Sequence, residues 1–295
     1  NLDQPGVYPL TITAKSDTIT RTAAFELTVI ENQPAVANLV SPADGTSGIP
    51  LKQTLSWDAV PDALSYQVQV AVGAPVFAPG NTVFDQTTNA TSVTVSGLQA
   101  GTVYYWRVEA TNACGTSGFS GFFAFQTGQP ECGFTFAAND LPIAIPDTST
   151  ALVTSSLNIS DSHVIADVNV GLKINHSWVG DLAARLVAPD GTTALLFEHP
   201  GFPALSSGCN GENLDLEFDD AAVLTATDLE NTCNNQPAIA GAFQPIQLLD
   251  RFHDIPVNGA WKMEVADIFP EDGGSIVEWN LTFCFYQPVP PAELV

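Results

Sequence analysis

The sequence predicts an all-β protein made of tandem β-sandwiches. Many short segments alternate apolar with polar residues, and turn residues separate these segments at short intervals. Glycine (22) and proline (21) are frequent and methionine occurs once, which favours strands and turns over helices. With 295 residues, of which 45% are hydrophobic, the chain is long enough for two domains and part of a third.

The charge of the chain narrows the classes of partner. There are 32 acidic residues against 8 lysines and arginines, a formal net charge of −24. Nucleic acids are not expected as partners, because phosphates require clustered basic residues. No run of 18 apolar residues occurs, so we expect no membrane insertion. Five widely spaced cysteines in an acidic, strand-rich chain are typical of disulfides in a secreted, extracellular or cell-surface protein.

Residues 1–31 predict two strands joined by a turn, because residues 6–14 and 24–30 both alternate. An isolated hairpin is marginally stable in water, so something must cover its apolar face. The segment resembles the last two strands of a bacterial immunoglobulin-like domain. We therefore expect a partial immunoglobulin-like hairpin here.

Residues 35–128 predict a complete β-sandwich that begins after the sequence Asn-Gln-Pro at 32–34. The unit resembles fibronectin type III domains in Trp57, in the Gly and Tyr residues of 97–104, and in the Trp-Arg-Val-Glu-Ala-Thr-Asn sequence at 106–112. The resemblance implies that Trp57 lies in the core and that Tyr104 is a corner tyrosine. The expected strands cover residues 39–42, 55–57, 66–70, 92–95 and 104–108.

Residues 131–287 predict the third unit and hold most of the charge. They contain 22 acidic and four basic residues, a net charge of −18, so a cation site is best sought here. A proline-rich segment, residues 288–295, is expected to be an extended linker. The expected strands of the unit cover residues 151–154, 164–172, 183–187, 260–265 and 276–283.

The third unit resembles the P domain (Homo B domain), a jelly-roll-like β-sandwich that accompanies proprotein convertases and many secreted bacterial proteases. The resemblance follows several motifs in order, above all His-Ser-Trp-Val-Gly-Asp-Leu at 176–182 and Asn-Gly-Ala-Trp-Lys-Met-Glu-Val-Ala-Asp at 258–267. The other motifs lie at 188–192, 218–222, 241–245, 272–274 and 279–281. The bulky side chains expected to pack between its sheets are Trp178, Phe218, Phe252, Trp261 and Trp279.

Several carboxylates of this unit are candidate calcium ligands. They fall at expected strand ends and loop starts, where converging oxygens repel one another unless a hard cation lies among them. The resemblance also implies calcium, because many bacterial P domains bind it. The alternative is that each aspartate caps its own turn or is simply solvated. The candidates are Asp181, Asp219 and Asp267 first, then Asp220 and Asp272.

The sequence contains no recognisable catalytic motif. Its four histidines form no His-Glu-x-x-His sequence, and no Gly-x-Ser-x-Gly elbow occurs. His176 matches a structural histidine in the P-domain pattern, so we expect it to be packed beside Trp178. The chain itself is expected to have no enzymatic activity.

The cysteines suggest two disulfides. Cys132 opens the third unit and Cys284 lies in its last strand, so a bridge between them would tie the first strand to the last. Cys209 and Cys233 flank the segment 218–221 and form the second expected pair. A Cys114–Cys132 bridge is the competing choice, because sequence alone does not fix connectivity.

The resemblance implies the non-catalytic C-terminal accessory region of a secreted or cell-surface bacterial protease, whose parent is a serine- or metallo-endopeptidase. In this hypothesis a calcium-stabilised P domain docks on an upstream catalytic domain of the same protein, and the fibronectin-type domain is a spacer. The alternative hypothesis is a structural subunit of an extracellular filament or adhesin, joined to neighbouring subunits by strand addition through residues 1–31. A third class, another binding module such as a carbohydrate-binding domain, would need exposed aromatic residues in a groove.

Overall fold

The computed structural model describes residues 5–29, 32–147 and 152–289, and it confirms the all-β prediction. The expected strand at 151–154 starts outside the described residues, as do the two ends of the 1–31 hairpin and most of the 288–295 linker. The chain divides into two compact units, residues 1–128 with 288–295, and residues 129–287.

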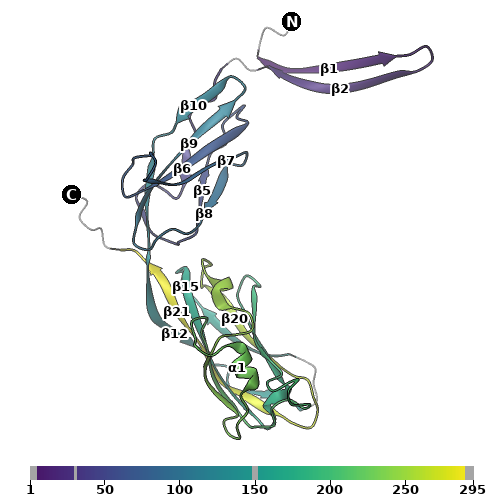
Figure 1. Cartoon of the computed structure of the whole chain (residues 1–295), viewed down its shortest axis with the longest axis vertical. Helices are drawn as coiled ribbons and strands as arrows, with labels where there is room; N and C mark the ends of the chain where they lie inside the picture. The colour runs from purple at the N-terminus through teal and green to yellow at the C-terminus, as the bar shows by residue number, and fades with distance from the viewer. Residues whose placement is uncertain (1–4, 30–31, 148–151, 290–295) are drawn as a thin grey trace. The chain divides into compact units, whose positions relative to one another are not determined.

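The first two strands form a separate hairpin. Strands β1 (Gly6–Lys15) and β2 (Thr20–Val29) pair only with each other in an antiparallel, two-stranded sheet (Figure 1). Leu10 lies opposite Phe25, and Ile12 lies opposite Ala23, so alternate apolar residues share one face. Ile12 is 61% exposed and Phe25 is 44% exposed. The hairpin therefore has an apolar face that is open in this structure.

The rest of the first unit is a sandwich of two sheets. One sheet has the order β3-β5-β8, and the other has the order β4-β11-β9-β6-β7 with β10 paired to β9. The strands are β3 (Leu39–Ser41), β4 (Thr46–Ile49), β5 (Gln53–Trp57), β6 (Ser65–Val72), β7 (Thr82–Thr88), β8 (Ser92–Val95), β9 (Val103–Asn112), β10 (Gly115–Phe119) and β11 (Phe123–Thr127).

The core of this sandwich confirms the two aromatic residues predicted from sequence. Trp57 is 3% exposed and packs edge-on against Tyr66 with ring centroids 5.4 Å apart. Tyr104 is buried, and its hydroxyl accepts a hydrogen bond of 2.8 Å from the backbone N–H of Gln99. A bond to backbone a few residues upstream is the pattern of a tyrosine corner.

The same sandwich shows how this chain holds a guanidinium group. The Arg107 guanidinium carbon lies 4.0 Å from the ring centroid of Phe77 and 3.8 Å from that of Phe119. Its Nε and Nη2 atoms donate hydrogen bonds of 3.0 and 2.7 Å to Gln69 Oε1. Two aromatic faces and one oxygen acceptor thus surround the cation, an arrangement that planar guanidinium favours.

The second unit is a jelly-roll-like sandwich of two larger sheets. One has the order β12-β21-β15-β18-β19 with β13 paired to β21, and the other has the order β14-β20-β16-β17 (Figure 1). The strands are β12 (Gln129–Ala137), β13 (Ile143–Ile145), β14 (Val153–Ile159), β15 (Ile165–His176), β16 (Leu182–Val187), β17 (Thr193–Glu198), β18 (Leu214–Phe218), β19 (Ile239–Phe243), β20 (Gly259–Asp267) and β21 (Gly274–Gln287). Three short helices, η1 (Val179–Asp181), α1 (Ala226–Asn231) and η2 (Leu249–Phe252), lie in its loops.

Large aromatic side chains fill the space between these two sheets. Trp261 on β20 and Phe283 on β21 are fully buried, with ring centroids 5.6 Å apart. Trp279 on β21 is also fully buried, and its Nε1 donates a 2.6 Å hydrogen bond to Ser155 Oγ on β14. Both contacts cross from one sheet to the other, so they fix how the sheets face each other.

Both disulfides named from the sequence form in the structure. Cys132 on β12 pairs with Cys284 on β21, and Cys209 pairs with Cys233. The first bridge joins neighbouring strands of one sheet, and the second holds together two loops. The competing Cys114–Cys132 bridge is wrong, because Cys132 is already bonded; Cys114 is exposed and belongs to neither disulfide.

Candidate functional site

A pocket of about 580 Å³ lies among three loops of the second unit. The first loop contains η1 and follows β15, the second runs through residues 199–208, and the third follows β20. We call it the Asp181 pocket. Its lining residues are Trp178, Gly180, Asp181, His199, Phe202, Ser206, Ser207, Gly208, Phe269, Pro270, Glu271 and Asp272.

Two glycines allow the first two loops to touch. The Gly180 N–H donates a 2.9 Å hydrogen bond to the Cys209 carbonyl. A Cβ on Gly180 would lie 2.4 Å from Cys209 N, and a Cβ on Gly208 would lie 2.8 Å from Gly180 Cα. Gly208 also has a φ of +67°, a conformation that side chains disfavour. Since Cys209 is disulfide-bonded, this contact places Asp181 at a fixed edge of the pocket.

Asp181 is the most unusual side chain of the pocket. It is 6% exposed, and within the described residues its carboxylate has no hydrogen bond or ion pair, although it lines the pocket. Burial, followed by the charges of Asp267 and Asp272, raises the pKa of Asp181 to about 6. Asp181 is therefore a buried acidic residue of the pocket lining without a direct partner in the described part of the chain.

Asp267 has a partner that Asp181 lacks. Its Oδ2 lies 3.1 Å from His176 Nε2, and both side chains are essentially unexposed. His176 Nδ1 lies 2.8 Å from the Trp178 carbonyl oxygen and accepts a 3.2 Å hydrogen bond from the Trp178 N–H, so both ring nitrogens have polar partners. This geometry agrees with the structural role expected for His176. Asp267 Oδ1 is buried and has no hydrogen-bond partner in the described part of the chain.

The five predicted metal ligands separate into two groups. Asp181, Asp267 and Asp272 are near enough for the last two to act on the charge of the first. Asp219 accepts a 2.7 Å hydrogen bond from the Ala221 N–H, which is the capping alternative. Asp220 accepts 2.8 Å bonds from two backbone N–H groups at the start of η2, those of residues 249 and 250.

Two of the three clustered carboxylates already have side-chain partners. Within the described ranges, no group of three or more His, Cys, Asp or Glu side chains is arranged to hold a metal ion. Asp267 is paired with His176, and Asp272 accepts a 2.7 Å hydrogen bond from Ser177 Oγ. Asp181 is the member of the cluster without such a contact.

Aromatic side chains form the walls of the Asp181 pocket. Phe202 is 55% exposed and Phe269 is 53% exposed, and Phe269 packs edge-on against His199 at 6.0 Å. The Trp178 indole is held by a 2.8 Å hydrogen bond from its Nε1 to the Ser207 carbonyl. The sequence analysis did not select Phe202, Phe269 or His199. Their signal was weak, because each is a single residue in a loop rich in Gly, Pro and Ser.

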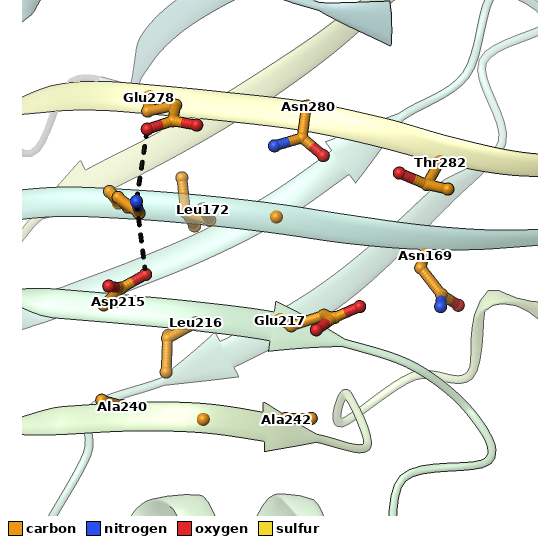
Figure 2. A pocket seen from close by; sticks show the side chains of 13 residues that line it. Asn169, Leu172, Asp215, Leu216, Glu217, Ala240, Ala242, Glu278, Asn280 and Thr282 are labelled. Carbon is orange, nitrogen blue, oxygen red and sulfur yellow. Dashed lines mark ion pairs between the residues drawn. The ribbon is translucent and has the colours of Figure 1, made fainter. Parts of the chain in front are cut away.

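A second hollow, of about 500 Å³, lies on the outer face of the β21-β15-β18-β19 sheet (Figure 2). We call it the Lys173 trough. Lys173 Nζ lies 3.4 Å from Glu278 and 3.9 Å from Asp215, one on each neighbouring strand. Gly171 leaves room for the Asn280 side chain, because a Cβ there would lie 2.7 Å from its Nδ2. No aromatic side chain lines this trough.

Comparisons with known proteins agree with this architecture. Residues 165–283 match the family described as the proprotein convertase P-domain. Within the described residues, no helix is long and apolar enough to cross a membrane.

Two curated relatives come from Streptomyces. One is the transglutaminase-activating metalloprotease of Streptomyces mobaraensis, 26% identical over 49% of this chain and 14% of the relative. The other is leupeptin-inactivating enzyme 1 of Streptomyces exfoliatus, 27% identical over 49% of this chain and 25% of the relative. This chain thus matches a minor part of each relative's length.

Two solved structures give partial superpositions. The serine protease of Aeromonas sobria is 15% identical, covering 68% of this chain and 35% of that chain with a TM-score of 0.36. An Fn3-like protein from Clostridium thermocellum is 25% identical, covering 34% of this chain and 99% of that chain with a TM-score of 0.26.

Proposed function

Because residues 165–283 match the proprotein convertase P-domain family, we propose that the chain is the non-catalytic C-terminal accessory region of a secreted or cell-surface bacterial protease. The family match is the observation that carries the proposal. In it, the P domain docks on a catalytic domain in the same polypeptide, and the fibronectin-type sandwich separates the P domain from other parts of the protein. The parent is a serine- or metallo-endopeptidase.

The relatives support a catalytic domain elsewhere in the parent. One of them is a metalloprotease by name, and the match covers 14% of its length. The histidines support the absence of catalysis in this chain. Their ring nitrogens contact carboxylates or backbone carbonyls, as in His163–Asp161, His199–Gly180 and His253–Asp167, rather than a hydroxyl or thiol nucleophile.

The test uses the full-length protein. The purified chain should not cleave casein or a fluorogenic peptide library, whereas the full-length protein should cleave both. Substituting Trp279→Ala in the full-length protein removes a buried cross-sheet contact and should reduce the yield of active protease. Hydrolysis by the isolated chain, or a full-length protein without hydrolytic activity, would overturn the proposal.

Calcium stabilisation of the P domain stays a prediction of this proposal. It is supported by the proximity of Asp181, Asp267 and Asp272 and by the unpartnered Oδ1 of Asp267. The measurement is the melting temperature of the chain in calcium and in EGTA. We expect a fall of several degrees on chelation, and an unchanged melting temperature would remove calcium from the proposal.

A second function is favoured by the hairpin. The open apolar face around Ile12 and Phe25 suits strand addition in a filament or adhesin subunit, whose partners are neighbouring subunits. Light scattering separates the two functions. A monomer at all concentrations supports the accessory region, and a polymer that F25S and I12S abolish supports the assembly subunit.

A further inference from the structure

The Asp181 pocket contains a negative charge that nothing in the described chain neutralises directly. We propose that this pocket binds an arginine side chain of a polypeptide partner, with Asp181 as its ion-pair partner and the aromatic walls around its guanidinium. The inference deepens the proposed function, on which it rests for the source of the arginine: a segment of the catalytic domain of the same protease.

The acidic residues of the Asp181 pocket indicate that its ligand is a cation. Asp181 is 6% exposed and lines the pocket, and its carboxylate has no hydrogen bond from the described residues. Asp272, and Glu271 beside it, add negative charge to the same lining. A buried carboxylate without a partner is costly, and a paired one with hydrogen bonds is much less so. The ligand that the pocket lacks is therefore a cation that can donate hydrogen bonds.

The aromatic side chains that form the walls of the pocket favour arginine over calcium. Calcium takes six to eight oxygen ligands, and aromatic rings supply none. Trp178, Phe202 and Phe269 instead offer the faces and edges on which a planar organic cation packs. Arginine fits better than lysine because its guanidinium stacks on rings and can bind a carboxylate through two N–H groups. Arg107, held between Phe77 and Phe119, shows that this chain already uses the arrangement.

Exposed apolar residues around the pocket indicate that the guanidinium belongs to a peptide. Apolar side chains in the two loops around the pocket are exposed: Phe202 (55%), Leu205 (44%), Ile268 (37%) and Phe269 (53%). Exposed apolar residues beside a polar centre are typical of a protein-binding surface. A free small cation would leave them uncovered, whereas an arginine with apolar neighbours in a peptide would cover them.

The first experiment is a titration of the intact chain, in EGTA, with the peptide Ac-Ala-Leu-Arg-Leu-Ala-NH₂ and its citrulline analogue. Binding is followed by calorimetry. Citrulline keeps the shape of arginine and lacks its charge. We expect the arginine peptide to bind at least about tenfold more tightly. Equal affinity for the two peptides, or no binding at millimolar peptide, would overturn the proposal.

Matched variants locate the site. D181N should abolish the preference for arginine, and F269A, which removes an exposed wall and keeps every charge, should weaken binding of the arginine peptide several-fold. E217Q removes an exposed carboxylate from the Lys173 trough and should leave binding unchanged. If D181N and F269A both bound the arginine peptide with wild-type affinity, the proposal would be overturned. Two variants are used so that the test remains valid if one of them folds poorly.

A calcium arm separates the two cations that compete for Asp181. If calcium binds with one-to-one stoichiometry, loses its affinity in D181N and displaces the peptide, the counter-ion is calcium and the arginine proposal is overturned. If calcium leaves peptide binding unchanged, the proposal is supported. A full-length protein without protease activity would sink the proposed function but not the peptide result, so the two failures are distinguishable.

Discussion

The second unit holds charge in two different ways at its two hollows. Beside the Asp181 pocket, the His176–Asp267 pair is closed off, with side-chain exposures of 0% and 1%. In the Lys173 trough, Lys173 and Glu278 are 47% and 54% exposed. Water screens the second pair, whereas the first must be satisfied by protein groups alone. The comparison indicates that the surroundings of a carboxylate, and not its presence alone, show where a ligand is required.

The largest expected effect is loss of the buried pair. H176A removes the partner of Asp267 and leaves a carboxylate buried, which should lower the free energy of unfolding by about 3–5 kcal/mol. Urea denaturation at pH 7 measures this. The double variant H176L/D267L should recover much of the loss, because no polar side chain is then left buried without its partner. If H176A lost less stability than the removal of an exposed ion pair costs, the contrast between the buried and the exposed pair would be contradicted.

The next effect has the opposite sign. D181N removes a buried charge without a direct partner, so in EGTA and without peptide it should raise the free energy of unfolding by about 1–2 kcal/mol. The matched trough variant D215N removes an exposed carboxylate and should change stability by less than about 0.5 kcal/mol. If D181N were less stable than the wild type in EGTA, the Asp181 carboxylate would have a stabilising partner. That result would contradict the contrast between the two hollows.

Sequence reasoning recovered the regular part of this architecture. Strands β9, β15 and β20 were predicted because their residues alternate between core and surface over many positions. Edge strands such as β4 and β7 were missed, and length is not the cause, since the short strands β3 and β8 were predicted. Tertiary packing, rather than local preference, makes these segments extended.

The site was predictable only in part. Asp181 and Asp267 were selected because they belong to motifs, and the structure brings them together. Asp220 was selected on the same grounds, yet it accepts hydrogen bonds from N–H groups 29 and 30 residues away, which no local pattern reveals. Phe202 and Phe269 were missed because loop residues have no periodicity.

An ion pair of intermediate exposure should give a modest pH dependence. His253 Nε2 lies 3.4 Å from Asp167 Oδ1, with side-chain exposures of 31% and 44%. The contact with Asp167 raises the pKa of His253 above its ordinary 6.5, against the opposing effect of burial. The same contact lowers the pKa of Asp167 below 3.8.

The sign of this effect follows from proton linkage. The contribution of His253 is complete below pH 6.5 and is lost as the pH rises through its raised folded pKa. Stability should therefore fall above pH 6.5, by less than about 1 kcal/mol because solvent screens the pair. H253Q should flatten that fall in urea titrations between neutral and mildly alkaline pH. If stability fell equally steeply with rising pH in H253Q, the pH dependence would come from another group.

The smallest effect is expected in the trough. K173Q removes both exposed ion pairs, with Asp215 and Glu278, yet should lower the free energy of unfolding by no more than about 1 kcal/mol. Because the pairs are screened, the difference from wild type should vanish in 1 M salt, where the Debye length is about 3 Å. The H176A loss should persist in the same salt, since its pair is buried. A K173Q loss as large and as salt-resistant as that of H176A would mean that the trough is not solvated in the way its exposure indicates, and the contrast between the two hollows would fail.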